Sequence, residues 1–203
     1  MRLDRLLTIR LASFAILTVL VAVGCKDERP ESPVSAARPP RITPDYAGLV
    51  IPPNIAPLNF KIDEPGLRYV VRIRSALGPA IEIFSKTGEI VIPPAAWKGL
   101  LNANVGRELH LDIYVKAEDG AWHQYETLTN TVASEAIDPY LVYRFMMPSS
   151  YFPKRMQICQ RNLETFEEQT LLDTQSFGNG CANCHSFVNN SPAQMLLGIR
   201  STS

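Results

Sequence analysis

A strict alternation of apolar and polar residues constrains the fold more than any other feature of this sequence. Its longest run alternates Leu109, Leu111, Ile113 and Val115 with His110, Asp112, Tyr114 and Lys116. A shorter run around Tyr69, Val71 and Ile73 has the same period of two. Successive side chains of a strand point to opposite faces, so this period predicts strands with one buried and one solvated face.

Turn signals divide the rest of this region into short strands. Asp119-Gly120 predicts a hairpin turn, and further strands are predicted at residues 141–145 and 156–161. Residues 93–101 predict one helical turn, with Trp97 and Leu101 facing the sheets. Many short strands separated by glycine and proline predict a mainly β fold, an immunoglobulin-like antiparallel β-sandwich over residues 46–170.

The N-terminus has the pattern of an export signal. Three arginines precede an apolar run from Leu11 to Val23, which is shorter than the ~20 residues of a membrane-spanning helix. The run ends in Ala22-Val23-Gly24-Cys25, which is similar to a bacterial lipobox. We therefore predict a lipoprotein signal peptide at residues 1–24 and a lipid on Cys25 that anchors the chain to a membrane. The alternative is an ordinary cleaved signal peptide that leaves a free cysteine.

Both alternatives predict an exported protein. With the lipid, the chain is expected in the cell envelope, at the outer membrane or the cell surface. Residues 25–45 contain five prolines among charged and small residues, namely Pro30, Pro33, Pro39, Pro40 and Pro44. Such a composition favours an extended chain without its own core, so this segment is predicted to be a tether.

Two cysteines and a histidine form a compact motif near the C-terminus, Cys181-Ala182-Asn183-Cys184-His185. This pattern is typical of c-type haem attachment. Each thiol adds to one vinyl group, and a short helical turn would space the sulfurs correctly; His185 would become the proximal axial ligand of the iron. Two alternatives stay open: a simple disulfide, or a zinc site that also uses Cys159.

The motif lies in a predicted haem-attachment segment at residues 171–203, mostly irregular or helical. Ser191-Pro192 predicts the start of a short helix with Met195, Leu196 and Ile199 on its apolar side. Met195 is the nearest candidate for the distal iron ligand, and the alternative is a methionine that only packs. More distant candidates are Met146, Met147, Met156, His110 and His123, and the site could also be open.

Charge and motif content narrow the function classes. The chain has 20 basic and 20 acidic residues and no clustered basic segment, so nucleic acid is not an expected partner. The predicted sandwich contains no Ser-His-acid order, paired acids or glycine-rich phosphate loop, which favours a non-enzymatic role without deciding the question.

Four stretches together resemble a known group, the TolB-like lipoproteins, mainly from Bacteroidetes, that carry a haem-type motif. These stretches are residues 51–60, 137–144, 160–168 and 181–187. The resemblance implies a β-rich N-terminal part and haem attachment through Cys181, Cys184 and His185, followed by a WD40-like propeller. The sequence ends at Ser203, where the propeller would begin, so we expect a truncated product or a natural short form. Gly198 stands near a position where that group often has histidine, which leaves the sixth iron ligand open.

The leading expectation is an exported, lipid-anchored protein with one covalent haem c that transfers single electrons at the cell envelope to a redox partner protein. The alternative is a cell-surface binding or scaffold module for glycan or protein, in which the haem motif is structural. A third hypothesis is a haem peroxidase with an open iron position.

Overall fold

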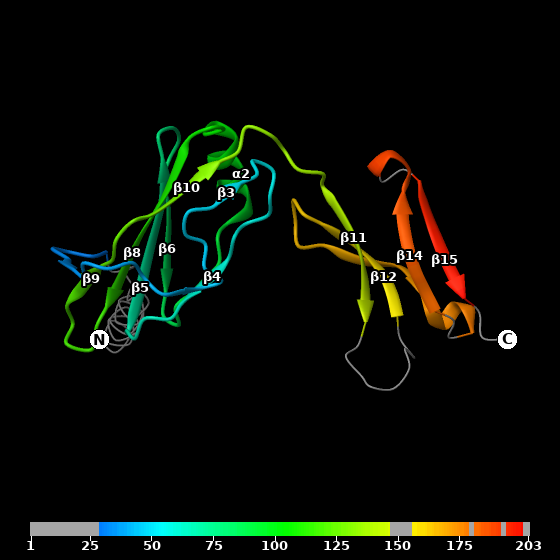
Figure 1. The fold of residues 1–203 in the computed structure, drawn as a ribbon. Coiled ribbons are helices and arrows are strands. Elements are labelled where there is room, and N and C mark those ends of the chain that lie inside the picture. The colour runs from blue at the N-terminus through cyan, green and yellow to red at the C-terminus, as the bar shows by residue number, and fades with distance from the viewer. Residues whose placement is uncertain (1–28, 147–155, 179–180, 192–193, 201–203) are drawn as a thin grey trace, which may run out of the picture.

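The computed structural model describes residues 29–146, 156–178, 181–191 and 194–200. Within them the protein is mainly β, as predicted, with several antiparallel sheets and a single α-helix, α2 (Pro94–Ala103). Figure 1 shows a β-sandwich built from the first part of the chain, then a three-stranded sheet, then a hairpin. The signal peptide and Cys25 lie outside the described residues.

The larger sheet of the sandwich is organised around its longest strand, β8 (Glu108–Lys116). On one side residues 109–116 of β8 pair with β5 (Arg68–Ser75), which also pairs with β6 (Ile81–Ser85). On the other side it pairs with β9 (Trp122–Gln124) and β10 (Leu128–Val132), one at each end. These in turn pair in parallel with β1 (Val34–Ser35) and β3 (Val50–Ile51).

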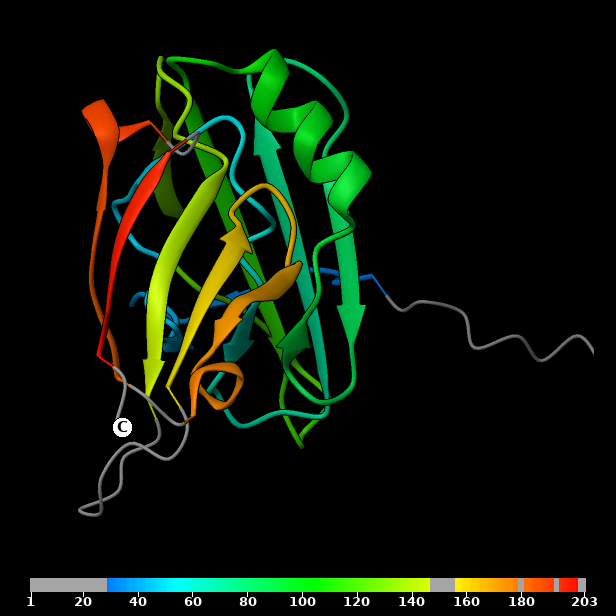
Figure 2. The ribbon, with the colours of Figure 1, turned by 90° about the vertical axis from the view of Figure 1, so that its right-hand side faces the viewer.

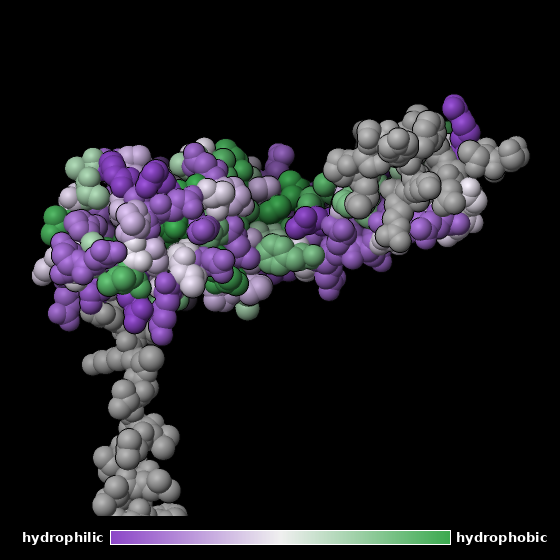
Figure 3. Space-filling model, turned by 90° about the horizontal axis from the view of Figure 1, so that it is seen from below, coloured by the Kyte–Doolittle hydropathy of each residue, from purple (hydrophilic) through white to green (hydrophobic). Residues whose placement is uncertain are grey.

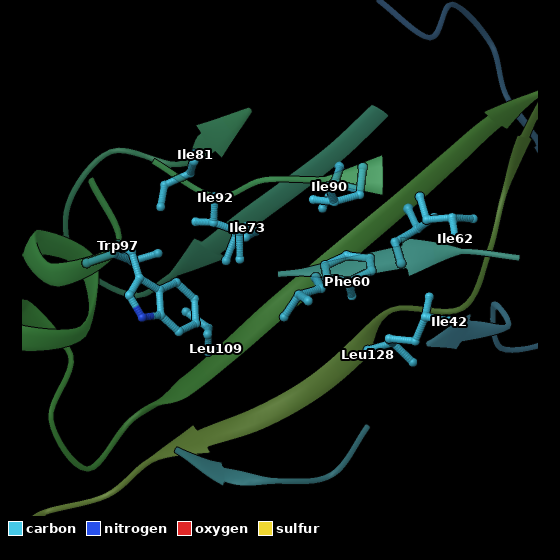
Figure 4. Packing of buried hydrophobic residues seen from close by; sticks show 14 of the residues in the cluster. Ile42, Phe60, Ile62, Ile73, Ile81, Ile90, Ile92, Trp97, Leu109 and Leu128 are labelled. Carbon is cyan, nitrogen blue, oxygen red and sulfur yellow. The ribbon is translucent and has the colours of Figure 1, made fainter. Parts of the chain in front are cut away.

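A smaller sheet faces the larger one and encloses the core. It consists of β2 (Ile42–Thr43), β4 (Phe60–Ile62) and β7 (Glu89–Ile90). The buried side chains come from both sheets and from α2, and Figure 4 shows several of them: Ile42, Phe60, Ile62, Ile73, Ile81, Ile90, Ile92, Trp97, Leu109 and Leu128. The period-two residues of β8 therefore face this core, as their alternation predicts.

Helix α2 begins directly after Pro93, with Pro94 in its first turn, where the missing N–H costs no hydrogen bond. Trp97 and Leu101 face the core as predicted, and the indole Nε1 of Trp97 donates to the carbonyl of Ile55 at 3.1 Å. The helix ends at Asn104, whose buried side chain donates to the carbonyls of Leu77 and Leu100, both at 2.8 Å.

The segment expected to be a tether enters the sandwich instead. Strands β1 and β2 belong to its two sheets, and Ile42 lies in the core. The physical reason is the buried carboxylate of Glu64, which accepts two hydrogen bonds from the Arg38 guanidinium at 2.6 and 2.7 Å and one from the backbone N–H of Arg41 at 2.8 Å. A proline-rich segment without a core of its own is held there by a charge from the loop between β4 and β5.

The strands that follow the sandwich form a separate sheet. Its order is β11 (Tyr140–Met146), β12 (Met156–Asn162) and β13 (Glu168–Asp173), all antiparallel, with an irregularity between Ile158 and Cys159. The sandwich sheets thus end at Val132, and the later strands of the segment predicted as sandwich up to residue 170 form a sheet of their own. The strands predicted at residues 141–145 and 156–161 are confirmed, but the sequence does not say which strands they pair with.

The C-terminal segment is a hairpin and not an irregular or helical segment. After the short helix η1 (Thr174–Phe177), β14 (Cys181–Phe187) pairs antiparallel with β15 (Met195–Arg200). Ser191 is not a helix start: it is extended, and its N–H donates to the carbonyl of Val188 at 3.0 Å, which closes the turn η2 (Val188–Asn190). The hairpin packs with β14 against β12, on the side away from the sandwich (Figures 1 and 2).

Among the described residues, no helix has the length and apolar character that crossing a membrane would require.

Candidate functional site

The haem-type motif occupies the first five residues of β14. The structure describes their backbone and not their side chains. Cys181 is paired with Arg200, Asn183 with Gly198 and His185 with Leu197. The motif is therefore held in a β-ladder, and the helical turn expected around the two cysteines is absent from this strand.

The ladder is irregular at the second cysteine. Its register shifts between Asn183 and His185, so Cys184 has no cross-strand partner. In a regular strand, residues three apart occupy opposite faces, and an extra residue interrupts that alternation. Two thiols and an imidazole are also the donor set that covalent haem attachment needs. By the chemistry of its donors, the motif fits a c-type haem.

Apolar side chains around the motif are exposed to solvent. Leu196 and Ile199 of β15 are 74% and 43% exposed, and Val188, which follows β14, is 50% exposed. The described surface seen from below is mixed, with hydrophobic atoms gathered where the sandwich gives way to the C-terminal sheets (Figure 3). A porphyrin is a large apolar group, and covering Leu196, Ile199 and Val188 with it would be favourable.

Met195, the nearest candidate for a distal ligand, lies at the start of β15 opposite Phe187 and is half-buried. Met156 is buried in β12, and Met146 on β11 is 47% exposed. Met147 lies outside the described residues.

The two histidines of the sandwich lie on β8 and β9, in a different sheet from the motif on β14. His110, on β8, lies near Thr129 and Glu108, with its ring nitrogens 3.3 and 3.5 Å from their side-chain oxygens. His123 is on β9, at the end of the sandwich remote from the hairpin (Figure 1). This placement does not favour His123 as an iron ligand.

Cys159, considered for a zinc site, is a buried free cysteine on β12 opposite Tyr143. The side chains that the structure describes contain no group of three or more His, Cys, Asp or Glu residues that could hold a metal ion. The side chains of the haem-type motif are not among them, so the zinc and disulfide alternatives stay hypotheses.

Two buried carboxylates of the sandwich, Asp112 and Glu64, are held in ion pairs. Arg74 Nε lies 2.7 Å from Asp112, whose carboxylate also accepts a hydrogen bond from Thr127 at 2.7 Å. Burial raises the pKa of Asp112, but the bonds from Arg74 and Thr127 outweigh it and hold that pKa below its usual value. The hydrogen bonds from Arg38 lower the pKa of Glu64 to about 2 against the effect of burial. These pairs are structural.

A polar groove of about 420 Å³ lies on the three-stranded sheet, lined by Tyr140, Gln160, Asn162, Glu167, Glu168 and Gln169. Sequence reasoning missed it, because its residues come from three strands whose pairing the sequence does not reveal. The available signal was an unusual run of amides and carboxylates in residues 160–169.

Comparisons with family models, with curated proteins and with solved structures found no match to this chain.

Proposed function

We propose that this chain is an exported, lipid-anchored c-type haem protein that transfers single electrons at the cell envelope. The observation that carries the proposal is the motif from Cys181 to His185 in a chain with an export signal. Haem is attached outside the cytoplasmic membrane, so motif and signal agree. The exposed apolar side chains beside the motif support the same conclusion.

Three residues of the motif have defined tasks. Cys181 and Cys184 would hold the group through thioether bonds, and His185 would supply a nitrogen ligand to its iron. When bound, the haem iron accepts and releases one electron. Met195 is proposed as the distal ligand, since it starts the strand that pairs with the motif.

Covalent retention of haem tests the central claim. The full chain is produced in a host with haem-maturation machinery, and its mass is measured after denaturation. We expect the added mass of one haem, lost completely in the Cys181→Ser/Cys184→Ser double variant. Cys159→Ser is the matched control, because this cysteine lies outside the motif, and it should retain the haem. Wild-type protein without the added mass would overturn the proposal.

Redox behaviour tests the electron-transfer role and the distal ligand. We expect the haem-loaded chain to change its visible spectrum reversibly on reduction. Thioether ligation raises the reduction potential, so Met195→Leu should lower the potential, whereas the exposed Met146→Leu should not. A spectrum that does not respond to reductant would contradict electron transfer. An unchanged potential in Met195→Leu would reject only this ligand.

Lipidation at Cys25 is tested separately. The wild-type chain should be recovered with membranes, and Cys25→Ala should be released into the soluble fraction, because the acyl chains supply the anchoring free energy. Membrane recovery of the variant would contradict the proposed anchor.

A further inference from the structure

The polar groove on the three-stranded sheet has the dimensions of a small-molecule site. Its volume of about 420 Å³ falls in the range of known ligand pockets, roughly 300–1,000 Å³. It is open to solvent and lies near the junction with the sandwich, since the neighbouring carbonyl of Leu163 accepts a hydrogen bond from the N–H of Ala56 at 2.7 Å.

Strand register brings the lining residues together. Tyr140 on β11 is paired with Asn162 on β12, and Gln160 on β12 is paired with Gln169 on β13. Gln160 and Asn162 are two residues apart, so they share one face of the sheet. One aromatic ring and three amides from three strands thus line the same surface.

The groove is held in shape by its own turn. The N–H of Asn162 donates to the carbonyl of Glu167 at 2.9 Å, and the side-chain oxygen of Asn162 accepts from the N–H of Glu164 at 2.9 Å. Neither the Gln160 nor the Gln169 side chain has a hydrogen-bond partner among the described residues. These two amides are therefore available to a ligand.

The lining chemistry selects the ligand class. An amide both donates and accepts hydrogen bonds, as a sugar hydroxyl does, and a carboxylate accepts strong bonds from hydroxyl groups. Tyr140, 43% exposed, offers a flat apolar ring with a polar tip, which suits the C–H face of a sugar ring. Glu167 adds a negative charge beside the amides, and the residues that line the groove include no Lys or Arg, so anionic ligands are disfavoured.

We infer that this groove binds a neutral carbohydrate chain, with one ring stacked on Tyr140 and its hydroxyls bonded by Gln160, Asn162 and Gln169. The site is distinct from the haem-type motif and does not depend on haem loading. It would let the protein contact a glycan of the envelope or of the surroundings.

Calorimetric titration of the full chain tests the inference. The neutral probes are hexasaccharides of β-1,4-glucose, α-1,4-glucose, β-1,4-mannose and β-1,4-xylose, and the anionic probe is hexagalacturonic acid. We expect saturable binding of at least one neutral probe and no binding of the anionic one. Absence of binding to all four neutral probes would overturn the inference, as would tighter binding of the uronic acid.

Variants locate the binding. Tyr140→Ala should weaken the neutral probe at least tenfold, Gln160→Ala should weaken it several-fold, and Tyr140→Phe should stay within about threefold because the ring is kept. Phe145→Ala is the matched control: it is an aromatic residue of the same strand, 45% exposed, on the opposite face by strand alternation. Unfolding midpoints of all variants are compared with the wild type. Equal loss in Tyr140→Ala and Phe145→Ala, or no loss in Tyr140→Ala, would reject the groove as the site.

Discussion

The sandwich and the C-terminal sheets bury their side chains very differently. The sandwich encloses a continuous core in which Val71, Ile73, Leu101, Leu109 and Ile113 have no exposed surface. Among the described residues from 140 onward, the buried hydrophobic side chains are Met156, Ile158 and Cys159, all on β12. Nine large apolar side chains of the same region are exposed, and they are Tyr140, Leu141, Phe145, Met146, Phe166, Leu171, Val188, Leu196 and Ile199.

This difference shows where each region obtains its stability. Burial of apolar area is the main favourable term in folding, and the sandwich supplies it from its own residues. A two-stranded hairpin is marginal in water and needs something to pack on. The C-terminal sheets therefore depend more on their junction with the sandwich and, in our proposal, on a bound group that covers the apolar side chains of the hairpin.

The largest expected effect contrasts one leucine from each region. Leu101→Ala in α2 should lower the free energy of unfolding by about 3 kcal/mol, because it removes a fully buried side chain and leaves a cavity. Leu196→Ala in β15, 74% exposed, should change it by less than about 0.5 kcal/mol. Urea unfolding followed by tryptophan fluorescence measures this, since Trp97 and Trp122 both lie in the sandwich. Equal effects of the two substitutions on the free energy of unfolding would contradict the proposed difference between the two regions.

The next effect concerns the charge that holds the N-terminal segment to the sandwich. Glu64→Gln should cost about 2 kcal/mol at pH 7, because the buried carboxylate loses its charge-assisted bonds to Arg38. The folded pKa of about 2 lies below the ordinary 4.5, so this stability is complete above pH 4.5 and is lost as the pH falls toward about 2.

Unfolding of the wild type and of Glu64→Gln is therefore compared at pH 7, 4.5 and 3. The difference between them should shrink over this range. A difference that stays constant with pH would show that the carboxylate is not the responsible group.

The junction between the sandwich and the C-terminal sheets should be stabilised by the side-chain amide of Asn54. Asn54 donates to the carbonyl of Ile137 at 2.9 Å and to Glu164 at 3.0 Å, and accepts from the N–H of Ile137 at 3.0 Å. In Asn54→Ala, hydrogen exchange of the Ile137 amide should accelerate about tenfold, which corresponds to roughly 1.4 kcal/mol.

Asn59→Ala is the matched control for Asn54→Ala, because Asn59 accepts from the N–H of Ile92 inside the sandwich at 2.9 Å. It should lower the free energy of unfolding measured by tryptophan fluorescence and leave hydrogen exchange of the Ile137 amide unchanged. Faster exchange of Ile137 in both variants would mean that the junction is not a separate unit.

The smallest expected effect separates two causes of a raised phenol pKa. In the sandwich, burial raises the pKa of Tyr114 and Tyr125. In the C-terminal sheet, a hydrogen bond to Glu168 raises the pKa of Tyr143 to about 12. Glu168→Gln should lower the pKa of Tyr143 and leave that of Tyr114 unchanged, as followed by ring signals in an NMR titration. A Tyr143 pKa that does not move would assign its shift to burial as well.

The strands of the sandwich were predictable because their signal is local. The alternation around Ile113 and the turn at Asp119-Gly120 depend on neighbouring residues alone, and the structure confirms both. Two other predictions were wrong because distant residues decide the outcome. Glu64 binds the proline-rich segment that was predicted to be a tether and holds it in the sandwich. Pairing with β14 makes residues 195–200 a strand, although Ser191-Pro192 predicted a helix there.

The sequence alone determined the mainly β class, the face of each long strand that meets the core, and the chemical character of the motif at Cys181 and His185. Periodicity and donor chemistry are properties of single segments and need no partner. Only the tertiary structure decided that β11–β13 form their own sheet, that the motif lies in a hairpin with a register shift, and that Tyr140 meets Gln160 and Gln169 in one groove. Strand pairing joins residues far apart in the chain. The backbone hydrogen bonds that hold paired strands together are the same for every pair, so a single segment does not reveal its partner.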